Sequence, residues 1–259
     1  MRKLLFFVPF LLAQFDTQAP RQLVWQDEFE GNQIDDEKWT AVIGDGCPDL
    51  CGFGNEELQY YDSTGWVVSD GRLSIVARNV ATGDRKYTSA RLITKGKGDW
   101  QYGRVEIRAK LPFGRGTWPA IWMLPTLAGR GMKWPLDGEI DIMEHVGYNQ
   151  GMIYGTIHTD KYNHGKGTHK NDSLLVPNAH EAFHVYAVTW DHQSMVWEVD
   201  GEEYFRLAKG TEPYEGWPFD QKFHLILNVA VGGTWGGKYG IDDTIWPQAM
   251  EVDYVRVYQ

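Results

Sequence analysis

The chain has 259 residues and a formal net charge of −10, and no block of lysines and arginines interrupts it. This balance argues against nucleic acid or an anionic membrane as a partner, because both attract basic surfaces. A neutral substrate is compatible with it.

The N-terminus has the pattern of a secretory signal. Met1, Arg2 and Lys3 precede a short apolar run, 4–13, which is too short to span a bilayer permanently. We expect residues 1–20 to be a signal peptide and the protein to be secreted, extracellular or periplasmic; an uncleaved buried helix is the alternative. The remainder, 21–259, has the length of one catalytic β-sandwich domain.

The chain contains 2 cysteines, Cys47 and Cys51, and both lie in a glycine-rich loop. In an oxidising compartment they could form a small disulfide that stiffens the loop, or they could remain unbridged. With no histidine beside them and no second pair of cysteines, a structural zinc site is not expected.

Strand patterns follow one another along the rest of the chain. Apolar and polar residues alternate in 72–77 and 104–110, and β-branched and aromatic residues are enriched in 120–124, 152–158, 183–190, 195–199, 223–231 and 251–258. Asp200-Gly201 marks the clearest hairpin. The 29 glycines and 11 prolines are spread throughout, and no helical period persists after the N-terminal run. This pattern predicts an all-β fold, a jelly-roll sandwich of two antiparallel sheets with a concave groove.

Three carboxylates occur on one short apolar segment, at Glu139, Asp141 and Glu144. Glycines at 138 and 147 bound it, and its length is typical of a strand. In a regular strand Glu139 and Asp141 face one side and Glu144 the other. A β-bulge at Ile142 and Met143 would bring Glu144 to the same face, where crowded carboxylates suit acid-base chemistry. An amphipathic strand with a solvated acidic side is the alternative.

Aromatic and polar residues elsewhere could line a groove. Trp118 and Trp122 are four residues apart and project to the same side of a strand, and Trp235 lies in a glycine-rich loop. Indole faces stack on the C–H faces of sugar rings, although such residues could also be core. His158 ends the segment that directly follows the carboxylates, so it should lie beside them in the sheet. The segment around Asn55 offers amides and carboxylates for hydroxyl recognition.

These segments together resemble the laminarinase-like endo-β-1,3-glucanases of glycoside hydrolase family 16. The resemblance rests on GEIDIMEHVG at 138–147, GNEELQYY at 54–61, WPAIWMLP at 118–125, GTIH at 155–158, NVAVGGTWGG at 228–237 and DYVRVY at 253–258. It runs from about residue 23 to the end. The three-carboxylate motif has the bulged spacing of the laminarinase branch.

The resemblance implies a retaining endo-hydrolase of β-1,3-glucans of the laminarin type or of mixed-linkage β-1,3-1,4-glucans. It implies that Glu139 is the nucleophile, Glu144 the acid/base and Asp141 an auxiliary carboxylate. Neighbouring negative charge is expected to raise the pKa of Glu144. Asn55, Trp118, Trp122, His158 and Trp235 would bind substrate.

The resemblance also implies a structural calcium ion, and no cofactor for catalysis. Glu28, Gly71 and Asp253 occupy the matching positions, although the same residues could make ordinary hydrogen bonds. A polysaccharide is the expected partner of a monomeric chain.

Two other functions fit the same fold. A non-catalytic carbohydrate-binding jelly roll would use the aromatic residues equally well, but binding alone gains little from crowded negative charge. A hydrolase of a marine galactan would call for basic residues in the groove if its substrate were sulfated.

Overall fold

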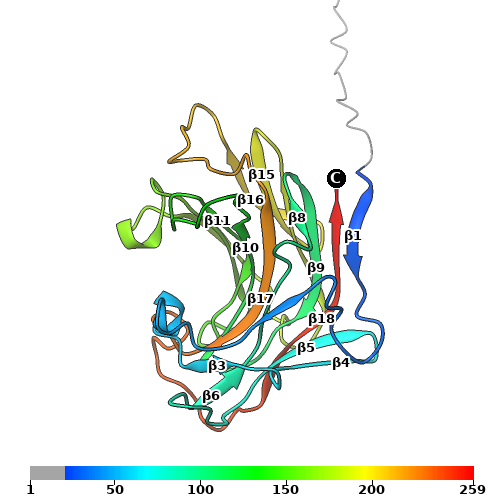
Figure 1. Ribbon diagram of the computed structural model, residues 1–259, viewed down its shortest axis with the longest axis vertical. Helices are drawn as coiled ribbons and strands as arrows, with labels where there is room; N and C mark the ends of the chain where they lie inside the picture. Colours follow the sequence, from blue (N-terminus) through cyan, green and yellow to red (C-terminus); the bar gives the residue numbers. More distant parts are fainter. Residues whose placement is uncertain (1–20) are drawn as a thin grey trace, which may run out of the picture.

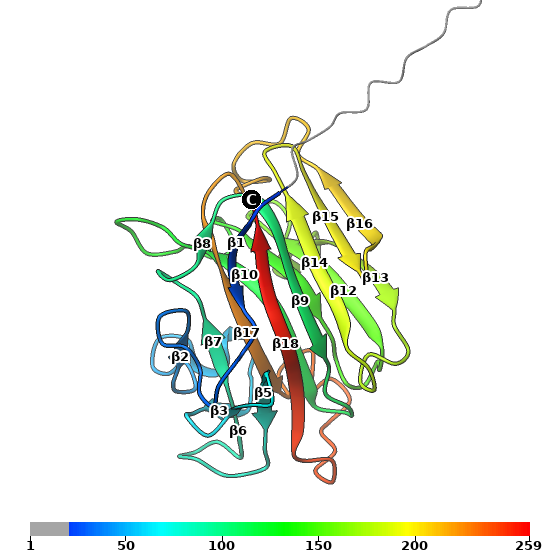
Figure 2. The same cartoon turned by 90° about the vertical axis from the view of Figure 1, so that its right-hand side faces the viewer.

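The computed structural model describes residues 21–259, so the predicted signal peptide at 1–20 lies outside the described part of the chain. Two sheets of 8 strands each stack face to face and curve together (Figures 1 and 2). This arrangement confirms the predicted all-β sandwich of antiparallel sheets. No helix within residues 21–259 is long and apolar enough to cross a membrane.

The convex sheet has the strand order β16-β15-β14-β9-β18-β5-β4, and β1 pairs with β18. Its strands are β1 Leu23–Asp27, β4 Trp66–Ser69, β5 Arg72–Ala77, β9 Gly103–Lys110, β14 His184–Trp190, β15 Ser194–Val199, β16 Glu202–Ala208 and β18 Gln248–Tyr258.

The concave sheet has the order β13-β12-β11-β10-β17-β7-β2, and β8 pairs with β17. Its strands are β2 Thr40–Val42, β7 Arg91–Ile93, β8 Asp99–Trp100, β10 Thr117–Pro125, β11 Glu139–Glu144, β12 Met152–His158, β13 Lys170–Leu175 and β17 Phe223–Val231. A small parallel pair, β3 Gln59–Tyr61 with β6 Tyr87–Ser89, and two 3-10 turns, η1 Cys51–Gly54 and η2 His164–Lys166, complete the elements.

The expected strands coincide closely with the observed ones. The segments predicted at 152–158 and 223–231 are β12 and β17 with the same bounds. The predicted hairpin also forms, because Val199 pairs with Glu202 and the two intervening residues, Asp200 and Gly201, have φ of 52° and 83°. Positive φ at both positions is what a two-residue hairpin turn requires.

The core lies between the sheets and is formed by the inward side chains of both. Strand β9 alternates buried and half-exposed residues along its whole length, whereas all nine residues of the central strand β17 are buried. The residues of β17 on one face pack in the core, and those on the concave face are also shielded from solvent by neighbouring side chains. The fully buried Trp197 of β15 crosses the core, and its Nε1 donates to the backbone oxygen of Asp141 in β11 over 2.8 Å.

We expect Trp197→Phe to destabilise the fold more than Trp190→Phe. Both indoles are buried in the same core, but Nε1 of Trp190 has no hydrogen-bond partner. Phenylalanine at 197 leaves a buried carbonyl without its donor, which costs about 1–3 kcal/mol beyond the cavity common to both variants. Urea denaturation of the two variants measures the difference, and equal destabilisation would contradict the role given to this hydrogen bond.

Candidate active site

A β-bulge interrupts β11 at the predicted place. On one side of the strand Met143 pairs with Ile121 while Asp141 pairs with Trp122, so Ile142 has no partner in β10. On the other side Asp141 pairs with Thr156 and Glu144 with Tyr154. Between these pairs β11 advances by three residues, whereas β12 advances by two. The extra residue reverses the alternation, and Glu144 joins Glu139 and Asp141 on the concave face.

The side chains at the bulge explain why it is stable. Ile142 and Met143 are both buried in the core, with 1% and 0% exposure, so neither is left in solvent by the irregular pairing. The donor from Trp197 satisfies the carbonyl of Asp141 at the same point. The bulge is thus fixed from the core side, and the carboxylates are fixed with it.

His158 lies beside the carboxylates, as predicted from its place at the end of β12. It pairs with Glu139 in the sheet, and its Nε2 is 3.4 Å from Asp141 Oδ2 and 3.8 Å from Glu139 Oε1. Burial lowers the pKa of His158 to about 3, so the ring is neutral at physiological pH. It offers the carboxylates a polar neighbour without a positive charge.

All three carboxylates have raised pKa values. Burial is the largest cause for each of them, and repulsion from neighbouring carboxylates adds to it at Glu139 and Asp141. The proximity of the two side chains lowers the pKa of Glu139 and raises that of Asp141. The pKa of Glu144 is raised to about 7 by burial and not by the neighbouring negative charge expected from the sequence. The group retains protons near neutral pH, and Asp141 is the member that favours its protonated form.

Two tryptophans each donate to one carboxylate. Trp118 Nε1 donates to Glu144 Oε1 over 3.1 Å, and Trp134 Nε1 donates to Glu139 Oε2 over 2.9 Å. Each indole hydrogen bond lowers the pKa of its carboxyl, against the effect of burial. Because they come from different parts of the chain, they can tune the two glutamates independently.

Trp134 is held by an ion pair at the base of its loop, between exposed Arg130 and buried Asp137. The carboxylate of Asp137, which is fully buried, accepts from both Nη atoms of Arg130 over 2.8 and 2.6 Å, from the amide of Lys133 and from the hydroxyl of Tyr214. The hydrogen bonds from Arg130 lower the pKa of Asp137 to about 2. The clamp keeps the 42%-exposed indole of Trp134 beside Glu139 and against the rings of His158 and His164.

On the Glu144 side the predicted Trp235 joins a group of aromatic rings. Its centroid is 5.7 Å from that of Trp118 and 5.1 Å from that of Tyr154, both with edge-to-face geometry. The loop that carries Trp235 is fastened to the predicted Asn55, whose backbone oxygen accepts from the amide of Thr234 over 2.8 Å. Asn55 and Trp235 therefore come from distant segments to adjacent positions.

A chain of hydrogen bonds runs under the groove to the predicted Trp122. Trp122 Nε1 donates to Asn228 Oδ1 over 2.7 Å, Asn228 donates to the hydroxyl of Tyr61, and that hydroxyl donates to Glu57 Oε2. Glu57 is 6% exposed and also accepts from Asn55 and Gln59. Burial raises the pKa of Glu57, opposed by these donors. The chain fixes the orientation of the Trp122 ring.

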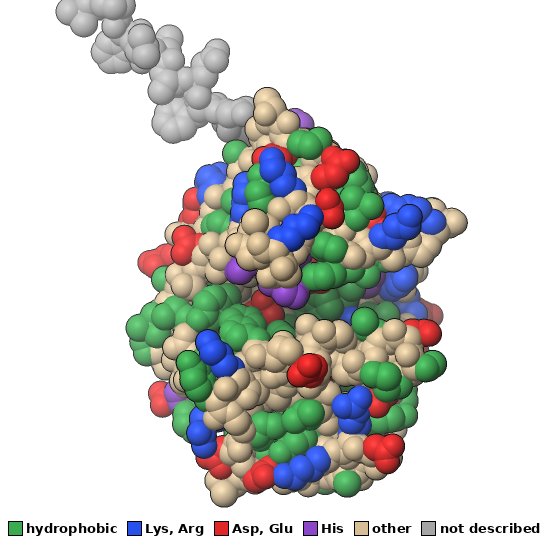
Figure 3. Space-filling view, turned by 90° about the vertical axis from the view of Figure 1, so that its left-hand side faces the viewer, with side chains coloured by type: hydrophobic (Ala, Val, Ile, Leu, Met, Phe, Trp, Pro, Cys, Tyr) green, Lys and Arg blue, Asp and Glu red, His purple; other side chains and the backbone are tan. Residues whose placement is uncertain are grey.

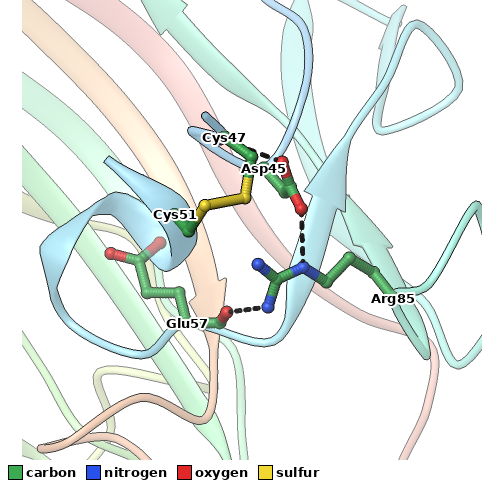
Figure 4. Close-up of a disulfide and its surroundings, with 5 residues drawn as sticks. All are labelled: Asp45, Cys47, Cys51, Glu57 and Arg85. Carbon is green, nitrogen blue, oxygen red and sulfur yellow. Dashed lines mark hydrogen bonds and ion pairs between the residues drawn. A yellow bond between two sulfur atoms is a disulfide. The ribbon is translucent and has the colours of Figure 1, made fainter. Parts of the chain in front are cut away.

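The cysteine loop stiffens this side of the groove. Cys47 and Cys51 form a disulfide, and Asp45 Oδ2 pairs with Arg85 Nε over 2.8 Å (Figure 4). The same guanidinium donates to the backbone oxygen of Glu57 over 3.0 Å. Disulfide, ion pair and Glu57 thus form one rigid support for Asn55.

The concave face is not flat. The concave side of the molecule is hollowed across its middle, and histidine and hydrophobic side chains border the hollow (Figure 3). Strand β11 is the third of the sheet from the β13 edge, so the carboxylates lie on an interior strand of the concave sheet and not on an edge strand.

The calcium positions predicted from the resemblance are engaged in ion pairs. Glu28 accepts from Arg256 through both of its carboxylate oxygens, over 2.8 and 2.9 Å, and Asp253 pairs with Arg108 over 2.6 Å. A calcium ion there would have to replace two guanidinium groups, and the prediction remains untested. Within residues 21–259, Glu139, Asp141 and His158 are the one group of three metal-ligand side chains that lie close together.

Sequence reasoning missed Trp134, Glu57, Asn228 and Arg91. The guanidinium of Arg91 lies over the ring of Trp122, 4.8 Å from its centroid. One signal was present for Trp134, an aromatic residue followed by proline five positions before the first carboxylate. The others were hidden because their roles depend on contacts between distant segments.

Comparison with known proteins agrees with this geometry. The profile of the family named Glycosyl hydrolases family 16 matches residues 60–256. The chain belongs to this family.

Family 16 relatives cover nearly the whole chain. A β-glucanase of Rhodothermus marinus is 50% identical over 253 residues, which are 93% of this chain and 87% of the relative. The X-ray structure of the laminarinase from the same organism has 49% identity and a TM-score of 0.87, covering 93% and 98% of the two chains. SCLam, described as a non-specific endo-β-1,3(4)-glucanase, has 42% identity and a TM-score of 0.84, covering 92% and 91%.

We expect the two indole donors of this family 16 site to control different carboxyls. Trp134→Phe should raise the pKa of Glu139, and Trp118→Phe should raise that of Glu144, because each variant removes a donor that favours the ionised form. A hydrogen bond to a charged group contributes about 1.5–3 kcal/mol, which corresponds to a shift of roughly one to two units in the pKa of the carboxyl. Carboxyl titration by NMR with ¹³C-labelled glutamate measures both shifts, and identical titration curves in the two variants would exclude separate control.

Proposed function

We propose that the chain is an endo-acting hydrolase of β-glucans that cleaves internal β-1,3 linkages, in laminarin-type and mixed-linkage β-1,3-1,4 chains. The observation that carries the proposal is the bulge that presents Glu139, Asp141 and Glu144 together on the concave face. Family membership and the substrates named for the relatives support the same reading.

In this proposal Glu139 is the nucleophile and Glu144 the acid/base of a retaining reaction. A retaining glycosidase holds its two carboxyls about 5–5.5 Å apart, one to attack the anomeric carbon and one to protonate the leaving oxygen. Burial raises the pKa of Glu139 to about 8 and that of Glu144 to about 7, so the site holds protons that its carboxyls share. The proposal assigns the proton to Glu144, because two neighbours, Trp134 and Asp141, oppose the effect of burial at Glu139, whereas Trp118 alone does so at Glu144.

The second half of the reaction reverses the roles of the carboxyls. Formation of the glycosyl ester at Glu139 consumes its negative charge, and Glu144, having given its proton to the leaving group, takes a proton from water that attacks the ester. Asp141, which lies on the same face of β11 as Glu139, orients the nucleophile. Trp118, Trp122, Trp235, His158 and Asn55 bind the glucan, and Trp134 extends this set on the Glu139 side.

Glu139→Ser should abolish hydrolysis of laminarin while the fold and binding of laminari-oligosaccharides persist. Removing a nucleophile costs about 10⁴-fold or more in kcat. Product sizing on laminarin, curdlan, lichenan, cellulose and agarose measures activity, and calorimetry with a non-cleaved oligosaccharide measures binding. Substantial residual hydrolysis, or cleavage of agarose in place of laminarin by the unaltered enzyme, would contradict the proposal.

The matched variant at the second carboxyl separates the two roles. Glu144→Ala should recover part of its activity on an activated aryl β-glucoside when azide is added, and the product should be the β-glycosyl azide. Azide enters where water would be activated, so β configuration follows from a covalent intermediate on Glu139. An α-glycosyl azide would mean that the roles are reversed or that the reaction inverts.

A structural calcium ion at Glu28, Gly71 and Asp253 is a further part of the proposal. An oxygen-only set of donors on the convex side suits calcium. We expect calcium to raise the melting temperature, EGTA to reverse the rise, and Asp253→Asn to remove it, because binding to the folded state alone stabilises it. If calcium leaves the melting temperature of the native chain unchanged, the Arg256 and Arg108 pairs are the permanent partners of these carboxylates.

We further propose that the protein is secreted and acts as a monomer. The Cys47–Cys51 disulfide supports secretion, because disulfides persist in oxidising compartments. The basic start and apolar run of the sequence support it independently.

A further inference from the structure

The carboxylates and histidine of the site have the composition of a transition-metal site. Glu139, Asp141 and His158 each offer one ligand atom, and these three atoms lie within 4.8 Å of one another. Ligand atoms bound to a tetrahedral zinc ion at about 2.0–2.2 Å lie roughly 3.4 Å apart. The distance from His158 Nε2 to Asp141 Oδ2 is 3.4 Å, and that to Glu139 Oε1 is 3.8 Å. The two carboxylates offer oxygens within 4.8 Å of each other, so an ion would draw them together.

The second observation is an unsatisfied oxygen directed into this cluster. Asp141 is 3% exposed, and its Oδ2 is buried without a hydrogen-bond partner. An unpaired buried carboxylate oxygen is costly, and a cation is the partner that would satisfy it best. Within residues 21–259 the ion pairs of Glu139 and Asp141 are with His158 alone, so no lysine or arginine supplies the positive charge.

The donor set selects the kind of ion. Calcium and magnesium prefer oxygen ligands only, whereas an imidazole nitrogen with carboxylates suits zinc, copper and nickel. Nε2 of His158 is the atom that faces the carboxylates, and its other ring nitrogen, Nδ1, would keep the proton.

We propose that a zinc-class divalent ion binds between Glu139, Asp141 and His158 and reversibly inhibits the enzyme. The inhibitory part rests on the proposed function, because the ion would engage the oxygen of Glu139 that faces the groove while Trp134 occupies the other. A metal-bound carboxylate cannot attack the anomeric carbon. Free zinc outside the cell would thus act as a competitive inhibitor of glucan hydrolysis.

Calorimetry with ZnCl₂ tests binding on the full chain, freed of metals with EDTA and kept in excess CaCl₂ so that any calcium site stays filled. We expect one zinc per chain. His158→Gln and Asp141→Asn should each weaken binding by about 100-fold or more, since even partners outside the ligand set cost about 10–100-fold. His192→Gln, which removes an exposed histidine in the turn between β14 and β15, is the matched control and should leave the affinity unchanged.

Two outcomes of the calorimetry overturn the site. One is an absence of zinc binding at millimolar concentration, and the other is an affinity that is the same in His158→Gln as in the unaltered chain. The site is supported if zinc binding is lost in His158→Gln and Asp141→Asn and is retained in His192→Gln.

The inhibitory step is measured separately. Zinc should raise the KM for laminarin without changing kcat, and EDTA should restore the initial rate. Zinc that binds through His158 without slowing hydrolysis overturns the inhibition. A zinc-free enzyme kept in excess CaCl₂ that fails to cleave laminarin would instead refute the proposed function, whatever the calorimetry gives.

Discussion

The chemistry of this molecule depends on one irregular step in a strand. Side chains of a regular strand alternate between faces, and Glu139 and Glu144 would point to opposite sides without the bulge at Ile142 and Met143. The core fixes that step, because both bulge side chains are buried and Trp197 donates to the carbonyl of Asp141. Two sheets that share a core are therefore needed to place three carboxylates on one face.

Burial gives these carboxylates their chemical character. Removal from water raises their pKa values, and the two indole donors oppose that effect at Glu139 and Glu144 respectively. The balance lets one site hold an ionised and a protonated carboxyl at the same pH. The same crowding makes the site attractive to a divalent cation, so the arrangement proposed for catalysis also explains the proposed sensitivity to zinc.

Features that depend on the order of residues within one strand, or in two consecutive strands, could be predicted from the sequence. A period of two allows the faces of β11 and β10 to be derived by counting, and His158 could be placed because its strand follows β11 directly. Trp134 could not be placed, because its position depends on the Arg130–Asp137 clamp and on Tyr214 far along the chain. The buried Glu57 was equally hidden, since its environment comes from Asn228 through Tyr61. At the predicted calcium positions the sequence matches the family, but the carboxylates of Glu28 and Asp253 pair with arginines. A matching residue type therefore does not by itself identify the partner.

The order of strands in the concave sheet places the reacting carboxylates and the ends of the groove on different strands. The carboxylates lie on β11, inside the sheet, whereas the edges are formed by β13 and β2. The disulfide loop and the 3-10 turn at His164–Lys166 lie beyond the central strands and connect elements near those edges. Substitutions and insertions in the disulfide loop can change the length and shape of the groove while the bulge keeps its neighbours. His164 is the exception in the turn, because its ring packs against those of His158 and Trp134. Relatives can therefore diversify in the chains they accept without rebuilding the reaction centre.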